Sequence, residues 1–148
     1  MTNQIVPQLT YGQIADIASS VGLTSTIERH DKAGPHVQCS WRVPGAETLM
    51  FRAIIGEDGF YVRLLGEVEI GELGWINLAN AWNASATPIT PAVPISTGYV
   101  LTHCTTFRHG ITTYNFARVL RTFAHAQGQL RERAVEAHAD ARDAASAP

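Results

Sequence analysis

Residues 36–43 of this chain read HVQCSWRV, and their polarity alternates along the whole stretch. Successive side chains of a strand point to opposite faces, so this pattern predicts a half-buried strand. One face would carry Val37, Cys39, Trp41 and Val43, and the other His36, Gln38, Ser40 and Arg42. Two more β-rich stretches follow at 48–55 and 60–65, joined through Asp58-Gly59, a pair typical of tight hairpins. Short strands with tight turns predict an antiparallel meander with one face on the core.

Three segments show the apolar periodicity of amphipathic helices. They are residues 11–21, residues 73–83 and a last segment that begins near Thr112. Thr10 and Gln13 have the spacing of a capping box, which marks the start of the first helix. The second helix would place four apolar side chains on one stripe: Trp75, Leu78, Ala79 and Trp82. The last helix has a stripe of Phe116, Val119, Leu120, Phe123 and Leu130.

Further β-rich stretches lie at 23–30 and 99–107. Three prolines precede the second of them, Pro88, Pro91 and Pro94. Because proline cannot donate a hydrogen bond to a central ladder, residues 87–95 are predicted to form an edge strand or polyproline II.

The predicted order is therefore helix, antiparallel meander of three or four strands, helix, two strands and helix, an α+β fold. Residues 1–130 are expected to form one domain. Residues 131–148 are charged and rich in alanine, which predicts a helical tail that ends in disorder.

The composition argues against several classes of function. The chain has 148 residues, of which 45% are hydrophobic and 16% charged, and a net charge of −2. Nucleic-acid binding needs a cationic surface, so this balance argues against it. Two cysteines cannot form a disulfide framework, which favours a reducing compartment. With no secretory pattern at the N-terminus and no long apolar run, we expect a cytoplasmic protein that does not bind membranes.

Candidate chemical groups do not form a known motif. The six histidines and two cysteines show no metal-ligand spacing, so we expect Cys39 to pack in the core and the histidines to be mostly solvated. Glu67, Glu69 and Glu72 could serve acid–base chemistry, but a solvated strand end explains them as well. The nearby glycines match no phosphate-binding loop. We therefore expect no catalytic residue, no metal and no cofactor.

One compositional feature remains: residues 73–107 contain no Asp, Glu, Lys or Arg. Interface cores are depleted of charge and enriched in aromatic residues. The second helix and the strand after it are therefore predicted to form a dimer or partner interface, although burial within the monomer is the alternative. The candidate residues are Trp75, Leu78, Trp82, Ile89, Val93 and Ile95.

The same half of the chain resembles the YbjN-type family of bacterial domains. The resemblance rests on Ile76-Asn77, on Ala81-Trp82-Asn83, and on Gly110-Ile111-Thr112 before a helix with Phe116, Leu120 and Phe123. It covers about Trp75 to Leu130 well and the rest more loosely. It implies the fold of type III secretion chaperones, commonly a homodimer without enzymatic activity, and a regulatory or chaperone-like role.

These observations predict a non-enzymatic, homodimeric domain that binds a protein client. The candidate client face lies opposite Leu49, Phe51, Phe60 and Val62, and carries Met50, Ile54, Tyr61 and Leu65. The competing hypothesis is a small-ligand domain or an enzyme with a pocket between the sheet and the last helix. Convergence of His103, Tyr114 or Arg118 in a deep cavity would favour that alternative.

Overall fold

The computed structural model describes residues 4–43, 47–85 and 90–147. The elements are β1 (Ile5–Val6), α1 (Tyr11–Ser20), β2 (Thr24–Glu28), β3 (His36–Arg42), β4 (Thr48–Ile55), β5 (Tyr61–Glu69), α2 (Ile76–Ser85), β6 (Ala92–Ile95), β7 (Gly98–Thr106), β8 (Ile111–Thr112) and α3 (Thr113–Ser146). Six strands form one antiparallel sheet in the order β2-β3-β4-β5-β7-β6, and β1 pairs with β8 separately. The predicted α+β class is confirmed.

Local sequence signals account for several element boundaries. The capping box of α1 is present, with the Gln13 amide donating to the Thr10 hydroxyl at 3.1 Å and the Gln13 side chain accepting from the Thr10 amide at 2.9 Å. Thr112 caps α3. The segment with Pro94 is an edge strand, β6, as its prolines predicted. The prediction for β5 was too short at residue 65, because β5 pairs with β7 as far as Glu69 and Gly98.

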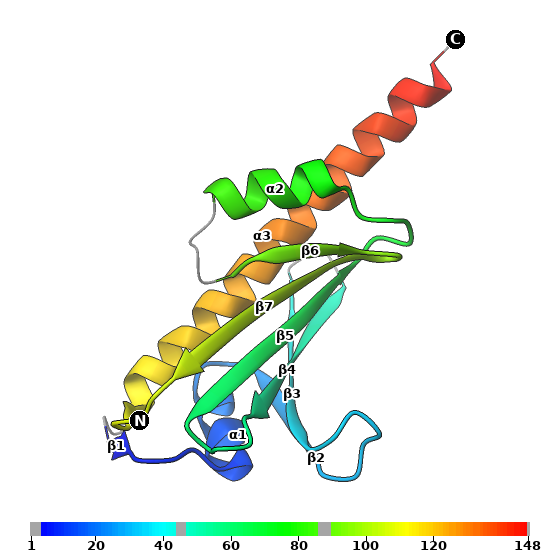
Figure 1. Cartoon of the computed structure of the whole chain (residues 1–148). Helices are drawn as coiled ribbons and strands as arrows, with labels where there is room; N and C mark the ends of the chain where they lie inside the picture. The colour runs from blue at the N-terminus through cyan, green and yellow to red at the C-terminus, as the bar shows by residue number, and fades with distance from the viewer. Residues whose placement is uncertain (1–3, 44–46, 86–89, 148) are drawn as a thin grey trace.

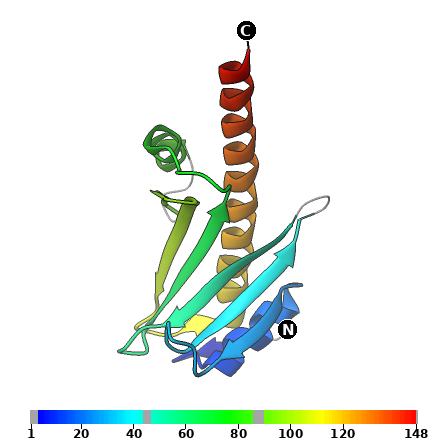
Figure 2. The ribbon, with the colours of Figure 1, turned by 90° about the vertical axis from the view of Figure 1, so that its right-hand side faces the viewer.

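Two helices cover one face of the sheet. Figures 1 and 2 show α1 and the long α3 on the same side, with α2 beside β6 at one end. The buried core lies between that face and the helices, and includes Val37, Cys39, Phe51, Leu64, Tyr99, Phe116, Leu120, Phe123 and Leu130. In the described part of the chain, no helix covers the opposite face of the sheet (Figure 2).

Helix α3 remains helical well beyond Leu130. Within the segment 131–148, Ala134 and His138 are buried, and the helix ends at Ser146. Gly128 lies within this helix, at the point where the Trp41 indole packs against it. Any other residue would place a Cβ within 2.7 Å of that indole. The close approach of Trp41 thus explains a residue that otherwise weakens a helix by about 1 kcal/mol relative to alanine.

Candidate functional site

The sheet splits between its two central strands. Strands β4 and β5 pair from Ile55 and Val62 only as far as Phe51 and Gly66. Beyond that point β4 continues along β3, and β5 continues along β7. Figure 2 shows the two strands diverging, with α3 behind the gap. The gap is a feature that no local sequence pattern predicted.

Gln127 of α3 fills the point where the strands separate. Its side-chain Nε2 donates to the carbonyl of Met50 at 2.8 Å and to the carbonyl of Glu67 at 2.9 Å. Met50 and Glu67 would form the next rung of the ladder, so the amide replaces a missing strand contact. The side chain is completely buried, and its Oε1 has no hydrogen-bond partner in the described structure.

Gly66 makes room for this contact. A Cβ at Gly66 would lie 2.9 Å from Phe123 and 3.0 Å from Nε2 of Gln127. Both distances are shorter than ordinary van der Waals contacts, so a larger residue would displace the two side chains of α3. Gly66 and Gln127 therefore act together at the point where the sheet divides.

A cleft of about 320 Å³ follows the gap. It is lined by Gln38, Glu47, Thr48, Leu49, Met50, Phe51, Arg52, Leu65, Glu67, Glu69, Val100 and Arg131. Two residues of the predicted client face, Met50 and Leu65, line the cleft, and Met50 is 51% exposed. Ile54 and Tyr61 are partly buried on the same open face, outside the cleft. The cleft thus combines apolar walls with carboxylate and guanidinium groups.

A second groove of about 480 Å³ adjoins this cleft. The two share Glu47, Glu69 and Arg131. From there the second groove follows α3 past Val135 towards Arg142. Arg131 was not among the expected site residues, because the charged stretch around it resembles an ordinary solvated helix.

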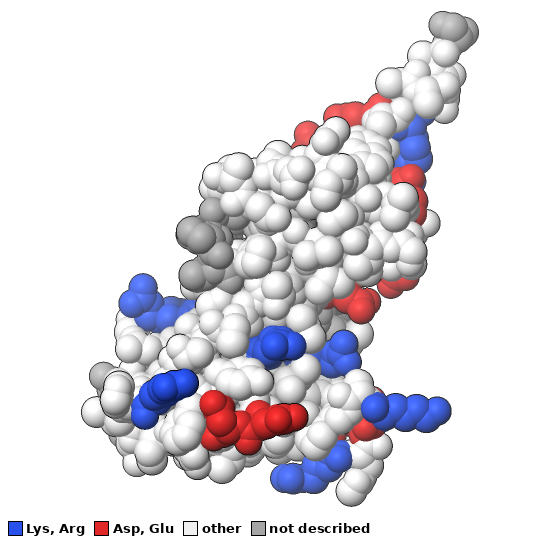
Figure 3. Space-filling model, in the orientation of Figure 1, with Lys and Arg blue, Asp and Glu red and all other residues white. Residues whose placement is uncertain are grey.

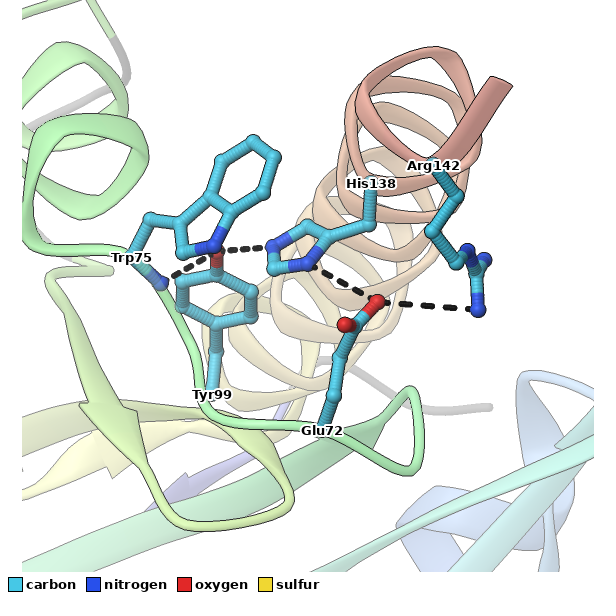
Figure 4. A network of polar contacts seen from close by, with 5 residues as sticks. All are labelled: Glu72, Trp75, Tyr99, His138 and Arg142. Atoms are coloured by element: carbon cyan, nitrogen blue, oxygen red, sulfur yellow. Dashed lines mark hydrogen bonds and ion pairs between the residues drawn. The ribbon is translucent and has the colours of Figure 1, made fainter. Parts of the chain in front are cut away.

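A polar network adjoins the second groove, with Tyr99 and His138 buried and Arg142 exposed (Figure 4). The hydroxyl of Tyr99 contacts Nε2 of His138 at 2.7 Å and accepts a hydrogen bond from the Trp75 amide at 2.8 Å. On the other side, Nδ1 of His138 lies 3.2 Å from Glu72, which also pairs with Arg142 at 3.6 Å. Although close, the contact between His138 and Glu72 lacks hydrogen-bond alignment. Glu72 is therefore an ion-pair partner and not only a solvated residue near a helix start.

The network contains side chains that could exchange protons with a substrate, but neither solvent nor a substrate can reach the Tyr99 hydroxyl. Tyr99 is fully buried, and desolvation raises its pKa, with the nearby Glu72 carboxylate adding to the effect and the hydrogen bond from the Trp75 amide opposing it. A neutral, enclosed phenol suits a structural hydrogen bond. His138 and His36 are buried and are exceptions to the expectation for the histidines, since His30, His109 and His125 are exposed.

The surface around α2 carries exposed apolar side chains. Leu73 is 66% exposed, Ile76 is 60% exposed and Trp75 is 39% exposed. The Trp75 indole stacks on His138 with 3.7 Å between ring centroids. Figure 3 shows a broad area without charged side chains over α2, bordered by charged side chains along α3, with further charges at the opposite end of the molecule. We call Leu73, Trp75 and Ile76 the α2 patch.

The other candidate interface residues lie in different surroundings. Val93 is exposed, and Leu78 and Ile95 are partly buried. Trp82 is only 3% exposed, and its indole N–H donates to the Thr90 carbonyl, so it supports the surface from within the monomer. Ile89 lies outside the described residues.

The edge of β6 is blocked against strand pairing. The side chain of Asn83 accepts from the Ala92 amide at 2.7 Å and donates to the Ala92 carbonyl at 3.0 Å. Because alternate residues of an edge strand face outwards, Pro94 is the next outward position, and it has no N–H. A partner at β6 would have to pack through side chains.

A third cavity lies between β7 and α3, where the alternative hypothesis placed a pocket. It measures about 290 Å³ and is lined by Thr90, His103, Asn115, Arg118, Val119, Thr122 and Phe123. His103 and Arg118 are therefore close together, whereas Tyr114 does not line this cavity and is largely exposed.

The potential metal ligands and the two thiols are dispersed over the described part of the chain. Among residues 4–43, 47–85 and 90–147, no three potential metal ligands gather at one point. Cys39 is fully buried in the core, as predicted, and desolvation raises the pKa of its thiol to about 12, while Cys104 is exposed. No described helix combines the length and the apolar character needed to cross a bilayer.

Comparisons with known proteins found no match among family models, curated proteins or solved structures. The YbjN-type resemblance and the secretion chaperone-like arrangement stay predictions.

Proposed function

We propose that this chain is a non-enzymatic, chaperone-like protein-binding domain that forms a homodimer through the α2 patch and binds a client on the open face of the sheet. The observation that carries the proposal is the partly exposed Trp75 at the edge of a broad uncharged surface over α2. Its indole is already ordered by the stack on His138, so binding would cost little conformational entropy. Ordered, partly exposed aromatic side chains are frequent energetic centres of interfaces.

Side-chain packing is the expected mode of self-association. The β6 edge beside the α2 patch offers few backbone groups, because Asn83 occupies those of Ala92. In contrast, the side chains of Leu73 and Ile76 extend the apolar surface around Trp75. A dimer built on this patch would bury apolar area and leave the open face of the sheet accessible to a client.

Sedimentation velocity tests the homodimer directly. At about 50 μM, the wild-type chain should sediment with twice the chain mass of 16.1 kDa. The variant Ile76→Lys should be monomeric, because a lysine in the centre of the patch would lose its hydration in the interface. Tyr114→Lys is the matched control, since Tyr114 is 51% exposed on the first turn of α3. A monomeric wild type would contradict the homodimer, and a dimeric Ile76→Lys would contradict its assignment to the α2 patch.

A small-ligand site is the second candidate function, favoured by the cavity that His103 and Arg118 line. Its polar lining contains no carboxylate, so a small anion is the suitable class of ligand. Phosphate or citrate at 10 mM should then raise the melting temperature of the wild type but not of Arg118→Ala. No shift in the wild type would argue against this candidate.

A further inference from the structure

The cleft between β4 and β5 and the groove beside α3 form one continuous channel. They share Glu47, Glu69 and Arg131 as lining residues, so the two cavities are joined at that point. The β5 wall from Leu65 to Glu69 spans roughly 13 Å at the rise of a strand. The α3 wall from Arg131 to Arg142 adds roughly 16 Å at the rise of a helix. Together the walls measure roughly 29 Å, and an extended polypeptide segment of about eight or nine residues fits that length.

The middle of the channel has an excess of negative charge. Glu47, Glu67 and Glu69 line it together with the guanidinium of Arg131, whereas Arg52 and Arg142 line the two ends of the channel. Neither Arg131 nor any of the three carboxylates forms an ion pair within the described part of the chain, where the ion pairs found are those of Glu72. Exposed carboxylates without a cationic partner favour a basic side chain in a ligand.

Apolar side chains lie at both ends of the channel, next to Arg52 at one end and Arg142 at the other. Met50, Leu65 and Val100 lie at the end near the split, and Ile70 and Val135 lie beside α3. These side chains offer sites for the apolar residues of a bound segment on either side of a central basic residue.

Strand edges face the channel as well. Met50 and Glu67 direct their carbonyls into the gap, where Gln127 binds them. By the alternation of a β-ladder, Thr48 and Glu69 are the next residues whose backbone groups face the gap. An extended chain presents backbone donors and acceptors at the same spacing, whereas a helix does not.

We propose that this channel binds an extended polypeptide segment with a lysine or arginine between apolar residues. The inference rests on the proposed function, because it specifies the chemistry of the client. It follows from the strand edges that face the gap, the carboxylates without an ion-pair partner in the middle and the apolar side chains at both ends.

Fluorescence anisotropy with three labelled heptapeptides tests the proposal. Each peptide has valine and leucine on both sides of a central residue, which is lysine, glutamine or glutamate. The lysine peptide should bind at least tenfold more tightly than the glutamate peptide in 50 mM salt, and the difference should shrink in 500 mM salt. Equal binding of the lysine and glutamate peptides, or no binding of the lysine peptide, would overturn the proposal.

Two double variants test whether the lysine peptide binds in the channel. The double variant Glu67→Gln/Glu69→Gln should weaken the lysine peptide at least fivefold and leave the glutamine peptide unchanged. Glu132→Gln/Glu136→Gln, on exposed positions of α3, is the control and should change neither. An equal loss in both double variants would overturn the assignment to the channel, and thermal melting would verify that both fold.

The peptide and sedimentation experiments can fail separately. A dimer that binds no lysine peptide would refute this inference alone, and a monomer that binds it would refute only the homodimer.

Discussion

Helix α3 buries two polar side chains about three turns apart, and they have different roles. Gln127 donates to two backbone carbonyls and thereby sets the shape of the sheet. His138 contacts side chains, Tyr99, Glu72 and Trp75, and thereby supports the surface next to α2. The difference shows how one helix can organise two separate surfaces, one through the backbone of the sheet and one through a side-chain network.

Replacing Gln127 should have the largest effect on stability. Gln127→Leu keeps a similar volume but leaves the buried carbonyls of Met50 and Glu67 without their donor. We expect a loss of about 2–4 kcal/mol in the free energy of unfolding, measured by urea denaturation. Gln129→Leu is the control, since Gln129 is exposed two positions along the same helix. Equal stability of the two variants would show that Gln127 does not hold the split strands.

Replacing His138 should have a smaller effect. His138→Ala removes the stack with Trp75 and the contact with the Tyr99 hydroxyl. The expected loss is about 1–3 kcal/mol in the free energy of unfolding, and His125→Ala, at an exposed position of α3, should cost far less. If the two histidine variants unfold at the same urea concentration, the network does not stabilise the fold.

Cys39 is a third buried group to compare with Gln127 and His138. Desolvation is the cause of its raised pKa, which goes from 9.0 to about 12. The thiol ionises first in the unfolded chain, so its contribution is fully present below pH 9 and is lost as the pH rises towards 12. Between pH 9 and 10 the wild type should lose about 1 kcal/mol more than Cys39→Ala, as measured by urea denaturation at each pH. Parallel pH profiles of the two proteins would contradict the assigned pKa.

Local patterns predicted much of the fold and little of the channel. The caps at Thr10 and Thr112 and the edge position of Pro94 depend on neighbouring residues, which the sequence displays directly. The contacts of Gln127 join residues far apart in the chain. Long-range contacts of this kind leave no periodic pattern in the sequence.

One signal could nevertheless have indicated both buried polar residues. The apolar stripe of α3 continues from Phe123 to Leu130 and Ala134, and Gln127 and His138 occupy positions on the same stripe. A polar residue within an apolar stripe is usually hydrogen-bonded when it is buried. Its partners, however, depend on the tertiary structure, so the split between β4 and β5 could not be derived from this stripe alone.

An NMR titration tests the central claim, that the split in the sheet forms a binding channel, most directly. We would record amide chemical shifts of the ¹⁵N-labelled chain during addition of the lysine-centred heptapeptide. The channel predicts changes at residues 48–50, 65–69 and around Arg131, and unchanged shifts in β2 at the far edge of the sheet. Changes confined to β2 or to α1, or no changes at saturating peptide, would contradict it.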